Sequence, residues 1–178
     1  AEQAYKESGI KIIKPDLVFA VDPPLDFKRL YNTYVRSIRI NPTLSKGGEA
    51  EFIINRFNQL FGGSPERNPK AYASASVFYR DAKDGGNARY LKSIPIRLYC
   101  DPDIEWFMNQ RKTPIEFTNT ADLSACIVQL NLLGNKNATL INCLGKGYLP
   151  NGTRHPHAFS MVDAEEFILW LNKTIVEK

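Results

Sequence analysis

Three short runs of hydrophobic residues, rich in β-branched and aromatic side chains, punctuate the chain. They lie at residues 16–21 (DLVFAV), 94–100 (IPIRLYC) and 138–144 (ATLINCL). Runs of this length with no polar alternation predict strands that are buried on both faces, as in a parallel sheet. The first two runs end abruptly, each at an Asp-Pro pair that begins with Asp22 or Asp101. Proline cannot donate a hydrogen bond into a sheet, so both strands should stop there.

Helical periodicity fills much of the sequence between these runs. Hydrophobic residues recur every three or four positions, in a loose pattern, over residues 27–61 and again over residues 122–133. Between those segments, residues 68–86 are rich in turn-forming residues and end in an Asp-Gly-Gly sequence. The pattern therefore predicts helical structure in the first two segments and a looped connection between them.

Both ends of the chain carry signals of helix termini. Residues 1–8 have the pattern of the end of a helix, closed by a glycine. Near the other end, Asp163 is placed as an N-cap with Glu166 three residues later, which makes a capping box. Val162 and Phe167 have the spacing of the hydrophobic contact that fixes the entry to such a helix. We therefore expect a well-defined last helix.

The alternation of buried strands with helices predicts an α/β fold, with a mostly parallel sheet and helices on both faces. The length of 178 residues suits one domain, which we take as residues 1–178. Three strands do not easily complete such a sheet, so we expect further strands upstream. The strand at residues 17–21 would then present an open apolar edge. We expect that edge to associate with an upstream fragment or a second copy, or else to be covered by residues 1–8.

Composition narrows the classes of function. The net charge of +4 is spread along the chain without a basic block, which argues against nucleic-acid binding. The longest apolar stretches, residues 17–21 and 167–171, are too short to cross a membrane. Three cysteines without metal-ligand spacing predict buried free thiols, and no motif indicates a metal or cofactor; they are Cys100, Cys126 and Cys143.

The cellular compartment stays open at this point. The sequence begins at Ala1 without a basic segment followed by an apolar one, so it shows no signal peptide of its own. The composition is that of a soluble protein. A secreted or periplasmic location, with the signal segment upstream of Ala1, remains one alternative.

Residues able to carry chemistry follow the strands. Asp22 comes directly after the first strand, Asp101 and Asp103 come after the second, and the only two histidines, His155 and His157, lie in the loop after the third. In open α/β sheets, functional groups gather at the carboxyl ends of strands. A serine hydrolase needs a carboxylate that orients its histidine, and in α/β-hydrolases the acid precedes the histidine in the chain. The order seen here matches the second half of that arrangement.

Several segments resemble the end of bacterial α/β-hydrolases of the esterase type. They are DPDIEW (residues 101–106), QLNLLGN (129–135) and GKGYLPNGTRHPHAFSMVD (145–163), and VFAVDPPLDF (18–27) is similar to the strand that follows the nucleophile in the same proteins. The resemblance is weakest at residues 28–61, within a possible cap or insert at residues 28–70. It implies a catalytic acid at Asp103, with Asp101 second, and a catalytic histidine at His157, with His155 second.

The nucleophile of that family has no counterpart in this sequence. The Gly-x-Ser-x-Gly motif would lie just before Ala1, and the nearest text, Gly62-Gly63-Ser64-Pro65-Glu66, favours a plain turn. We read Asp22 and Asp26 as structural or pocket-lining. Aromatic residues flanking the expected site are candidates for an acyl or aryl pocket, although such residues are more often core; they are Trp106, Phe107, Tyr148 and Phe159.

Two functions therefore compete. The first is hydrolysis of small carboxylic esters by a Ser-His-Asp mechanism, in which His157 is the base, Asp103 orients it and an upstream segment supplies the serine. On this hypothesis the 178-residue chain alone is inactive. The second is a non-catalytic fragment or degenerate relative that serves as a binding or structural module. Without the resemblance, Asp101 and Asp103 would be read as turn residues that cap backbone amides.

Overall fold

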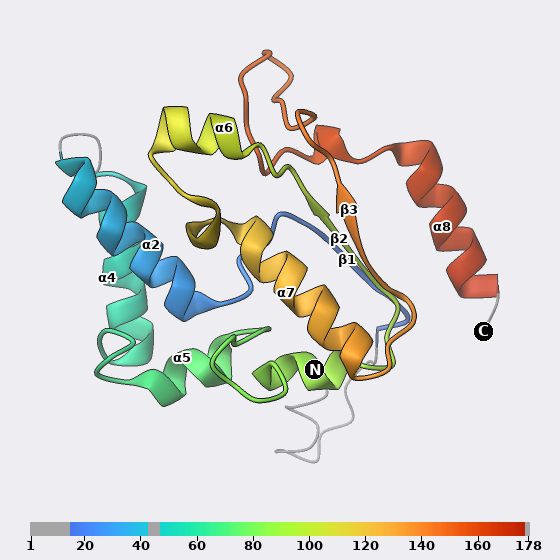
Figure 1. Ribbon diagram of the computed structural model, residues 1–178, viewed down its shortest axis with the longest axis horizontal. Helices are drawn as coiled ribbons and strands as arrows, with labels where there is room; N and C mark the ends of the chain where they lie inside the picture. Colours follow the sequence, from blue (N-terminus) through green and yellow to red (C-terminus); the bar gives the residue numbers. More distant parts are fainter. Residues whose placement is uncertain (1–14, 43–46, 177–178) are drawn as a thin grey trace.

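The computed structural model describes residues 15–42 and 47–176, so the helix end expected at residues 1–8 lies outside the described residues. The fold is mixed α/β (Figure 1). The strands are β1 (Val18–Val21), β2 (Ile96–Cys100) and β3 (Ala138–Asn142), and the longer helices are α2 (Phe27–Ile40), α4 (Glu49–Phe61), α5 (Pro69–Ala75), α7 (Asn119–Leu132) and α8 (Ala164–Val176). Shorter helical turns are α6 (Ile104–Trp106), η1 (Gly86–Leu91), η2 (Phe107–Arg111), η3 (Ile115–Phe117) and η4 (Phe159–Met161).

The three predicted strands form one parallel sheet in the order β1-β2-β3. Ile96 at the start of β2 lies between Val18 of β1 and Ala138 of β3. The α/β class and the parallel pairing are thus confirmed. Burial on both faces holds for β2, whose five residues are all buried, but β1 and β3 are only partly buried. The reason is that each of these two has a single neighbour among the described strands.

Successive residues of β2 point to opposite faces and define two packing layers. Leu98 and Cys100 face α7, where they pack with Leu123, Cys126 and Leu130 in the largest hydrophobic cluster. This packing explains why the α7 residues at helical spacing are buried while the opposite side of that helix is exposed.

The other face of the sheet is covered by α8 and by the segment before it. Tyr99 packs with Cys143 and Met161, and Phe167 of α8 lies against this cluster. Arg97 reaches across to Glu166 at 2.7 Å and lies 4.5 Å from the ring of Trp170. Helices therefore lie on both faces of the sheet, and Figure 1 shows α7 on one side of the strands and α8 on the other.

Helix α8 begins close to the predicted position. Asp163 accepts a hydrogen bond from the amide of Glu166 at 3.1 Å, so the N-cap is confirmed. The reciprocal half of the capping box is replaced, because the Glu166 carboxylate bonds Arg97. Val162 and Phe167 both pack against the Tyr99 cluster, as the expected hydrophobic contact requires.

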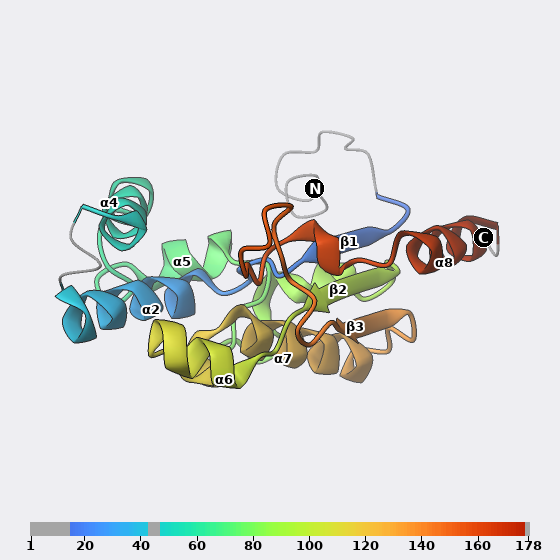
Figure 2. The same cartoon turned by 90° about the horizontal axis from the view of Figure 1, so that it is seen from above.

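A separate helical lobe is built from α2, α4 and α5, at the opposite end of the molecule from α8 (Figures 1 and 2). Its core is aromatic and contains Tyr31, Phe57, Tyr72 and Tyr79. The segment predicted as a looped connection contains helix α5, because Pro69 occupies its first turn and Tyr72 packs into this core. The lobe spans most of the possible insert at residues 28–70, whose role as a cap stays a prediction.

The expectations for the three cysteines and for a turn at residues 62–66 are met. The three cysteines are free and buried, and burial raises the pKa of Cys100 to about 11 and that of Cys126 to about 12. The carbonyl of Ser64 accepts hydrogen bonds from the amides of Arg67 and Asn68, which confirms a turn there. Among the described helices, none combines the length and the apolar character that crossing a membrane requires.

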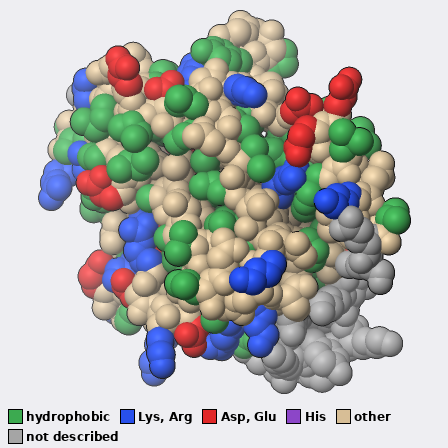
Figure 3. Space-filling model, turned by 45° about the vertical axis from the view of Figure 1, so that its right-hand side comes forward, with side chains coloured by type: hydrophobic (Ala, Val, Ile, Leu, Met, Phe, Trp, Pro, Cys, Tyr) green, Lys and Arg blue, Asp and Glu red, His purple; other side chains and the backbone are tan. Residues whose placement is uncertain are grey.

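Charged side chains are mixed with hydrophobic ones on the surface. On the face that Figure 3 shows, Lys and Arg occur in small separate groups and form no continuous basic patch. Hydrophobic side chains lie between them in similarly small groups.

Candidate functional site

The candidate site lies at the carboxyl edge of the sheet, where the ends of β1 and β2 meet the loop that follows β3. Asp22 is the first residue after β1 and Asp101 the first after β2. Both carboxylates are buried. The loop at residues 143–158 carries both histidines and joins β3 to η4, which leads into α8.

His157 pairs with Asp22. Its Nδ1 lies 2.7 Å from Oδ2 of Asp22, which is a hydrogen-bonding distance. The Asp22 side chain is 4% exposed, whereas the His157 side chain is 52% exposed. In the neutral imidazole this arrangement places the proton on Nδ1 and leaves Nε2 as an acceptor.

The surroundings of His157 favour its charged form. The hydrogen bond to Asp22 raises the pKa of the imidazole above its ordinary value, against an opposing effect of burial. The negative charge of Glu49, at the start of α4, acts in the same direction. The helical lobe thus brings a second carboxylate near the same imidazole. His155 is the other neighbour, with its ring centre 5.4 Å from that of His157.

Asp22 has an unusual backbone. Its φ angle of 43° places it in the left-handed region, which residues other than glycine seldom adopt. Its amide still donates to the carbonyl of Tyr99 at 2.8 Å, as if β1 continued for one more residue. The strand therefore ends in a turn that sends the Asp22 side chain toward the histidine loop.

Asp101 has different partners. Its carboxylate accepts hydrogen bonds from the amides of Gly145 at 2.9 Å and Gly147 at 2.8 Å, and it forms an ion pair with Arg154. Burial alone would raise the pKa of Asp101. The hydrogen bonds from Arg154, Gly147 and Gly145 outweigh that effect and hold the pKa below its ordinary value.

Asp103 is bonded to the same arginine. Its Oδ2 lies 3.1 Å from Nη2 of Arg154, and its Oδ1 accepts the amide of Trp106 at 2.9 Å, so Asp103 is the N-cap of α6. In the described part of the chain, no hydrogen bond or ion pair joins Asp101 or Asp103 to a histidine. The hydrogen bond expected between Asp103 and His157 is instead made by Asp22, because Arg154 occupies the carboxylates that follow β2.

His155 lies inside the loop. Its amide donates to the carbonyl of Gly147 at 2.9 Å, which helps to close the loop on itself. Its Nδ1 is buried and has no hydrogen-bond partner in the described structure. Of the two histidines, His157 is therefore the one whose side chain is held by a carboxylate.

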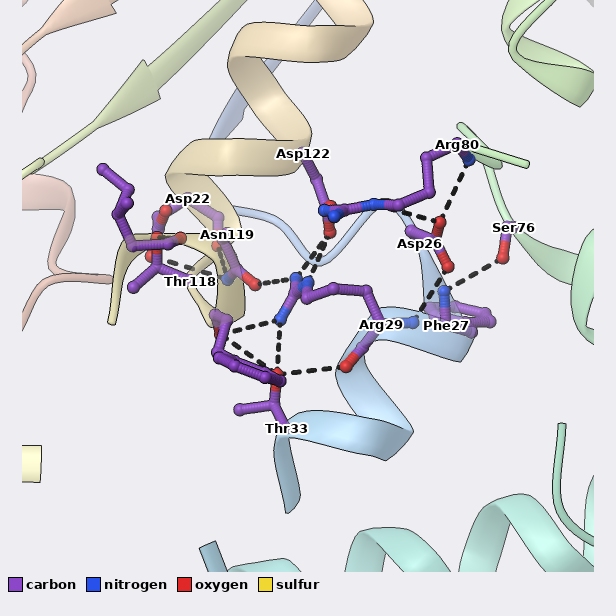
Figure 4. Close-up of polar contacts among 12 residues, drawn as sticks. Asp22, Asp26, Phe27, Arg29, Thr33, Ser76, Arg80, Thr118, Asn119 and Asp122 are labelled. Carbon is purple, nitrogen blue, oxygen red and sulfur yellow. Dashed lines mark hydrogen bonds and ion pairs between the residues drawn. The ribbon is translucent and has the colours of Figure 1, made fainter. Parts of the chain in front are cut away.

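A buried polar network lies behind Asp22 (Figure 4). The guanidinium of Arg29 bonds Asp122 and Asn119, and Arg80 pairs with Asp122 from the other side. Asn119 in turn donates from Nδ2 to the carbonyl of Asp22 at 2.8 Å. Asp26 caps α2 by accepting the amide of Arg29 at 3.0 Å, so its expected structural role is confirmed.

Sequence reasoning missed Asn119, Arg29 and Asp122. Arg29 and Asp122 lie in segments that the hydrophobic pattern marks as helical, where polar residues are ordinarily assigned to the solvent-exposed face, and Asn119 lies just before the second of these segments. The available signal is that Asn119 and Asp122 stand in the first turn of α7, directly below the carboxyl edge of the sheet. Arg29, in turn, stands in the first turn of α2.

The aromatic residues proposed as pocket-lining have varied surroundings. The Arg154 guanidinium lies 5.6 Å from the ring centre of Trp106 and 5.2 Å from that of Tyr148. Phe107 packs edge-on against Trp106, and Phe159 is largely exposed. The aromatic rings around the arginine thus stabilise the Asp101–Arg154 group, and a role in substrate binding stays a prediction.

Two other features bear on ligands. Among the described residues, no three His, Cys, Asp or Glu side chains are grouped so that they could hold a metal ion. A hollow of about 210 Å³ lies on the far side of the buried network, where Lys28 and Asp81 form an ion pair of 2.6 Å at its wall. Arg29 and Arg80, which also line it, are engaged with Asp122.

Comparison of the chain with protein-family models, with curated proteins and with solved structures found no match.

Proposed function

We propose that this chain carries the acid and the base of a serine hydrolase that acts on small carboxylic esters, on a partial α/β-hydrolase fold. In this proposal His157 is the general base and Asp22 orients it. The observation that carries the proposal is the 2.7 Å contact between Nδ1 of a half-exposed imidazole and a buried carboxylate at the end of a parallel strand.

The arrangement fits the chemistry of acyl transfer. With Nδ1–H bound to Asp22, Nε2 accepts the proton of a serine hydroxyl as that oxygen attacks the ester carbonyl. The carboxylate stabilises the imidazolium that results, and the imidazolium then returns the proton to the leaving alcohol. A pKa raised by Asp22 is the electrostatic signature of this stabilisation.

We place the nucleophile on a segment upstream of Ala1, where the resemblance to the esterases puts it. Cys100, Cys126 and Cys143 are unsuitable, because burial raises the pKa of each thiol and keeps it protonated. Ser160, in the loop that bears the histidines, already donates to the carbonyl of Tyr148 at 2.6 Å. The proposal therefore predicts no ester turnover by the 178-residue chain alone.

The test is labelling with a fluorophosphonate, which reacts only with an activated serine. The product of the full coding sequence is the protein to use. We expect one labelled serine, and we expect His157→Ala and Asp22→Asn to slow labelling by roughly 10³- to 10⁴-fold. Asp103→Asn is the matched control and should label at the rate of the natural protein.

Two results would contradict the proposal. If no serine of the longer protein reacts, the hydrolase reading is wrong. If the 178-residue chain hydrolyses a p-nitrophenyl ester and His157→Ala abolishes that turnover, the nucleophile lies within the chain and its assignment to an earlier segment is wrong.

A second candidate function is a non-catalytic binding module. The observation in its favour is the apolar surface around α8, where Ile168, Leu169 and Ile175 are exposed and Phe19 of β1 is 41% exposed. Exposed apolar residues gathered in this way often mark a contact surface. Absence of labelling together with a stable complex in solution would favour this function over the first.

A further inference from the structure

Asn119 lies between the two polar groups of the site. It is the first residue of α7 and is 9% exposed. Its Oδ1 accepts a hydrogen bond of 2.6 Å from Nη2 of Arg29, while its Nδ2 donates to the carbonyl of Asp22 at 2.8 Å and more weakly to the Asp22 carboxylate at 3.5 Å. One side-chain amide thus joins the buried network to the residue that holds His157, as Figure 4 shows.

Arg29 fixes which way this amide faces. A guanidinium has only donors, so the atom of Asn119 that meets it must be the oxygen. Arg29 itself cannot turn away, because its Nε donates to Asp122 at 2.7 Å and its Nη1 donates to the carbonyl of Phe117 at 3.3 Å. With Oδ1 committed to Arg29, Nδ2 points to Asp22.

Asp22 needs such a partner. A left-handed conformation at a residue other than glycine is strained and persists only where neighbouring groups hold it. The amide of Asp22 is held by Tyr99, and Pro23 restricts the chain that follows. The Asp22 carbonyl is held by Asn119, which fixes the peptide plane on the other side of the strained residue.

We propose that Asn119 is a positioning residue for the site: its amide, oriented by Arg29, holds Asp22 in the conformation from which the carboxylate reaches His157. The inference rests on the His157–Asp22 pair of the proposed function but not on ester hydrolysis. Its test needs neither substrate nor nucleophile, so its failure and a failure of the labelling experiment are distinguishable.

The experiment is an NMR titration of the two imidazoles in the 178-residue chain, with His155→Gln used to assign the signals. The charged groups that face His157 are Asp22 and Glu49, with the ring of His155 beside it. In Asn119→Ala, we expect the His157 midpoint to fall, by less than the roughly 1 pH unit that loss of the paired charge itself would cause.

Asn135→Ala is the matched control. Asn135 is also buried, and its Nδ2 likewise donates to backbone carbonyls, those of Leu91 and Ile94, at 2.9 Å. This variant should lose comparable stability and leave the His157 midpoint unchanged. A midpoint that is the same in Asn119→Ala as in the natural chain would overturn the proposal, since Asn119 would then serve the fold alone.

A second measurement covers the case in which Asn119→Ala does not fold. In the natural chain, the side-chain NH₂ signals of Asn119 should shift with pH at the same midpoint as the His157 ring, because both groups contact Asp22. Signals that stay constant through that titration would equally overturn the proposal.

Discussion

The ends of β1 and β2 present the same residue in the same place, but their partners differ. Asp22 and Asp101 each follow directly on a strand, each is buried, and each precedes a proline. Asp22 meets an imidazole, which gains and loses a proton near neutral pH. Asp101 contacts a guanidinium and two backbone amides, and these groups do not exchange a proton near neutral pH. A position at the end of a strand therefore identifies a carboxylate as a candidate for chemistry, and the side chain that it contacts shows which candidate is suited to it.

The two aspartates are nevertheless connected through the loop after β3. Asp101 binds the start of that loop through the amides of Gly145 and Gly147, and a later point of it through Arg154. The histidines follow Arg154 directly. Asp101 thus anchors the loop whose far side delivers His157 to Asp22, which is a structural role, whereas the role of Asp22 in chemistry belongs to the proposed function.

The largest effect should come from Asp101→Ala. The substitution removes the buried carboxylate that pairs with the Arg154 guanidinium, which is only 12% exposed, and leaves that guanidinium only the partly exposed Asp103. Removing one partner of a buried ion pair costs about 3–5 kcal/mol, which urea unfolding measures. Asp81→Ala removes one partner of an exposed pair with Lys28 and is the control, with an expected loss below about 1 kcal/mol. Equal losses in the two variants would contradict the anchoring role.

The ionisation of Asp101 also makes the stability of the chain depend on pH. Because the folded-state pKa of Asp101 lies below its unfolded value, its contribution is present above the unfolded pKa and is lost as pH falls through the folded one. The free energy of unfolding of the natural chain should therefore decline below pH about 4. Asp101→Ala should show a shallower decline over that range.

Gly147→Ala tests how closely the loop is packed on Asp101. A Cβ at this position would lie 2.6 Å from the carbonyl oxygen of His155 and 2.9 Å from a carboxylate oxygen of Asp101. We expect a loss of about 2–3 kcal/mol, since overpacking here must shift backbone. Gly152→Ala, in open space at a positive φ, should cost only about 1 kcal/mol. A smaller loss for Gly147→Ala than for Gly152→Ala would show that the loop is not held against Asp101.

Much of the fold was predictable, because the signals that determine it are local. Continuous apolar runs located β1, β2 and β3, and a cap at Asp163 located the start of α8. Helix α5 was missed because its seven residues are too few for a clear period, and it is stabilised by packing of Tyr72 in a distant aromatic core. The partly exposed state of β1 depends on which strands neighbour it, which a local pattern does not contain.

The candidate site was predictable only in part. The sequence places Asp22, Asp101, Asp103 and the histidines at one edge of the sheet, and the structure agrees. Which carboxylate meets His157 depends on Arg154, a residue of the loop whose pairing across the chain no spacing reveals. Asn119 and Arg29 were missed for the same reason, since their contacts join segments about 90 residues apart.

Asp22→Asn should change the titration of His157 more than it changes stability. The His157 pKa is raised in the folded chain, so its contribution to stability is complete below the unfolded pKa, about 6.5, and is lost as pH rises through the folded pKa. The ring is half exposed, and solvent screening limits the loss in the variant to at most about 1 kcal/mol at pH 6. NMR should show the His157 midpoint lowered by roughly 1 unit. An unchanged midpoint would mean that the pair does not exist in solution.

Asp103→Asn should have the smallest effect, and it decides between the carboxylate expected from the sequence and the one that the structure pairs with His157. Asparagine is as good an N-cap for α6 as aspartate, so the bond to the amide of Trp106 survives. The substitution removes the negative charge of Asp103, but Arg154 keeps its ion pair with Asp101. The loss in the free energy of unfolding should therefore stay below about 1 kcal/mol. The His157 midpoint should equal that of the natural chain, because the partner of its Nδ1 is untouched. A fall in that midpoint as large as the one in Asp22→Asn would return the orienting role to Asp103 and make the pairing with Asp22 incidental.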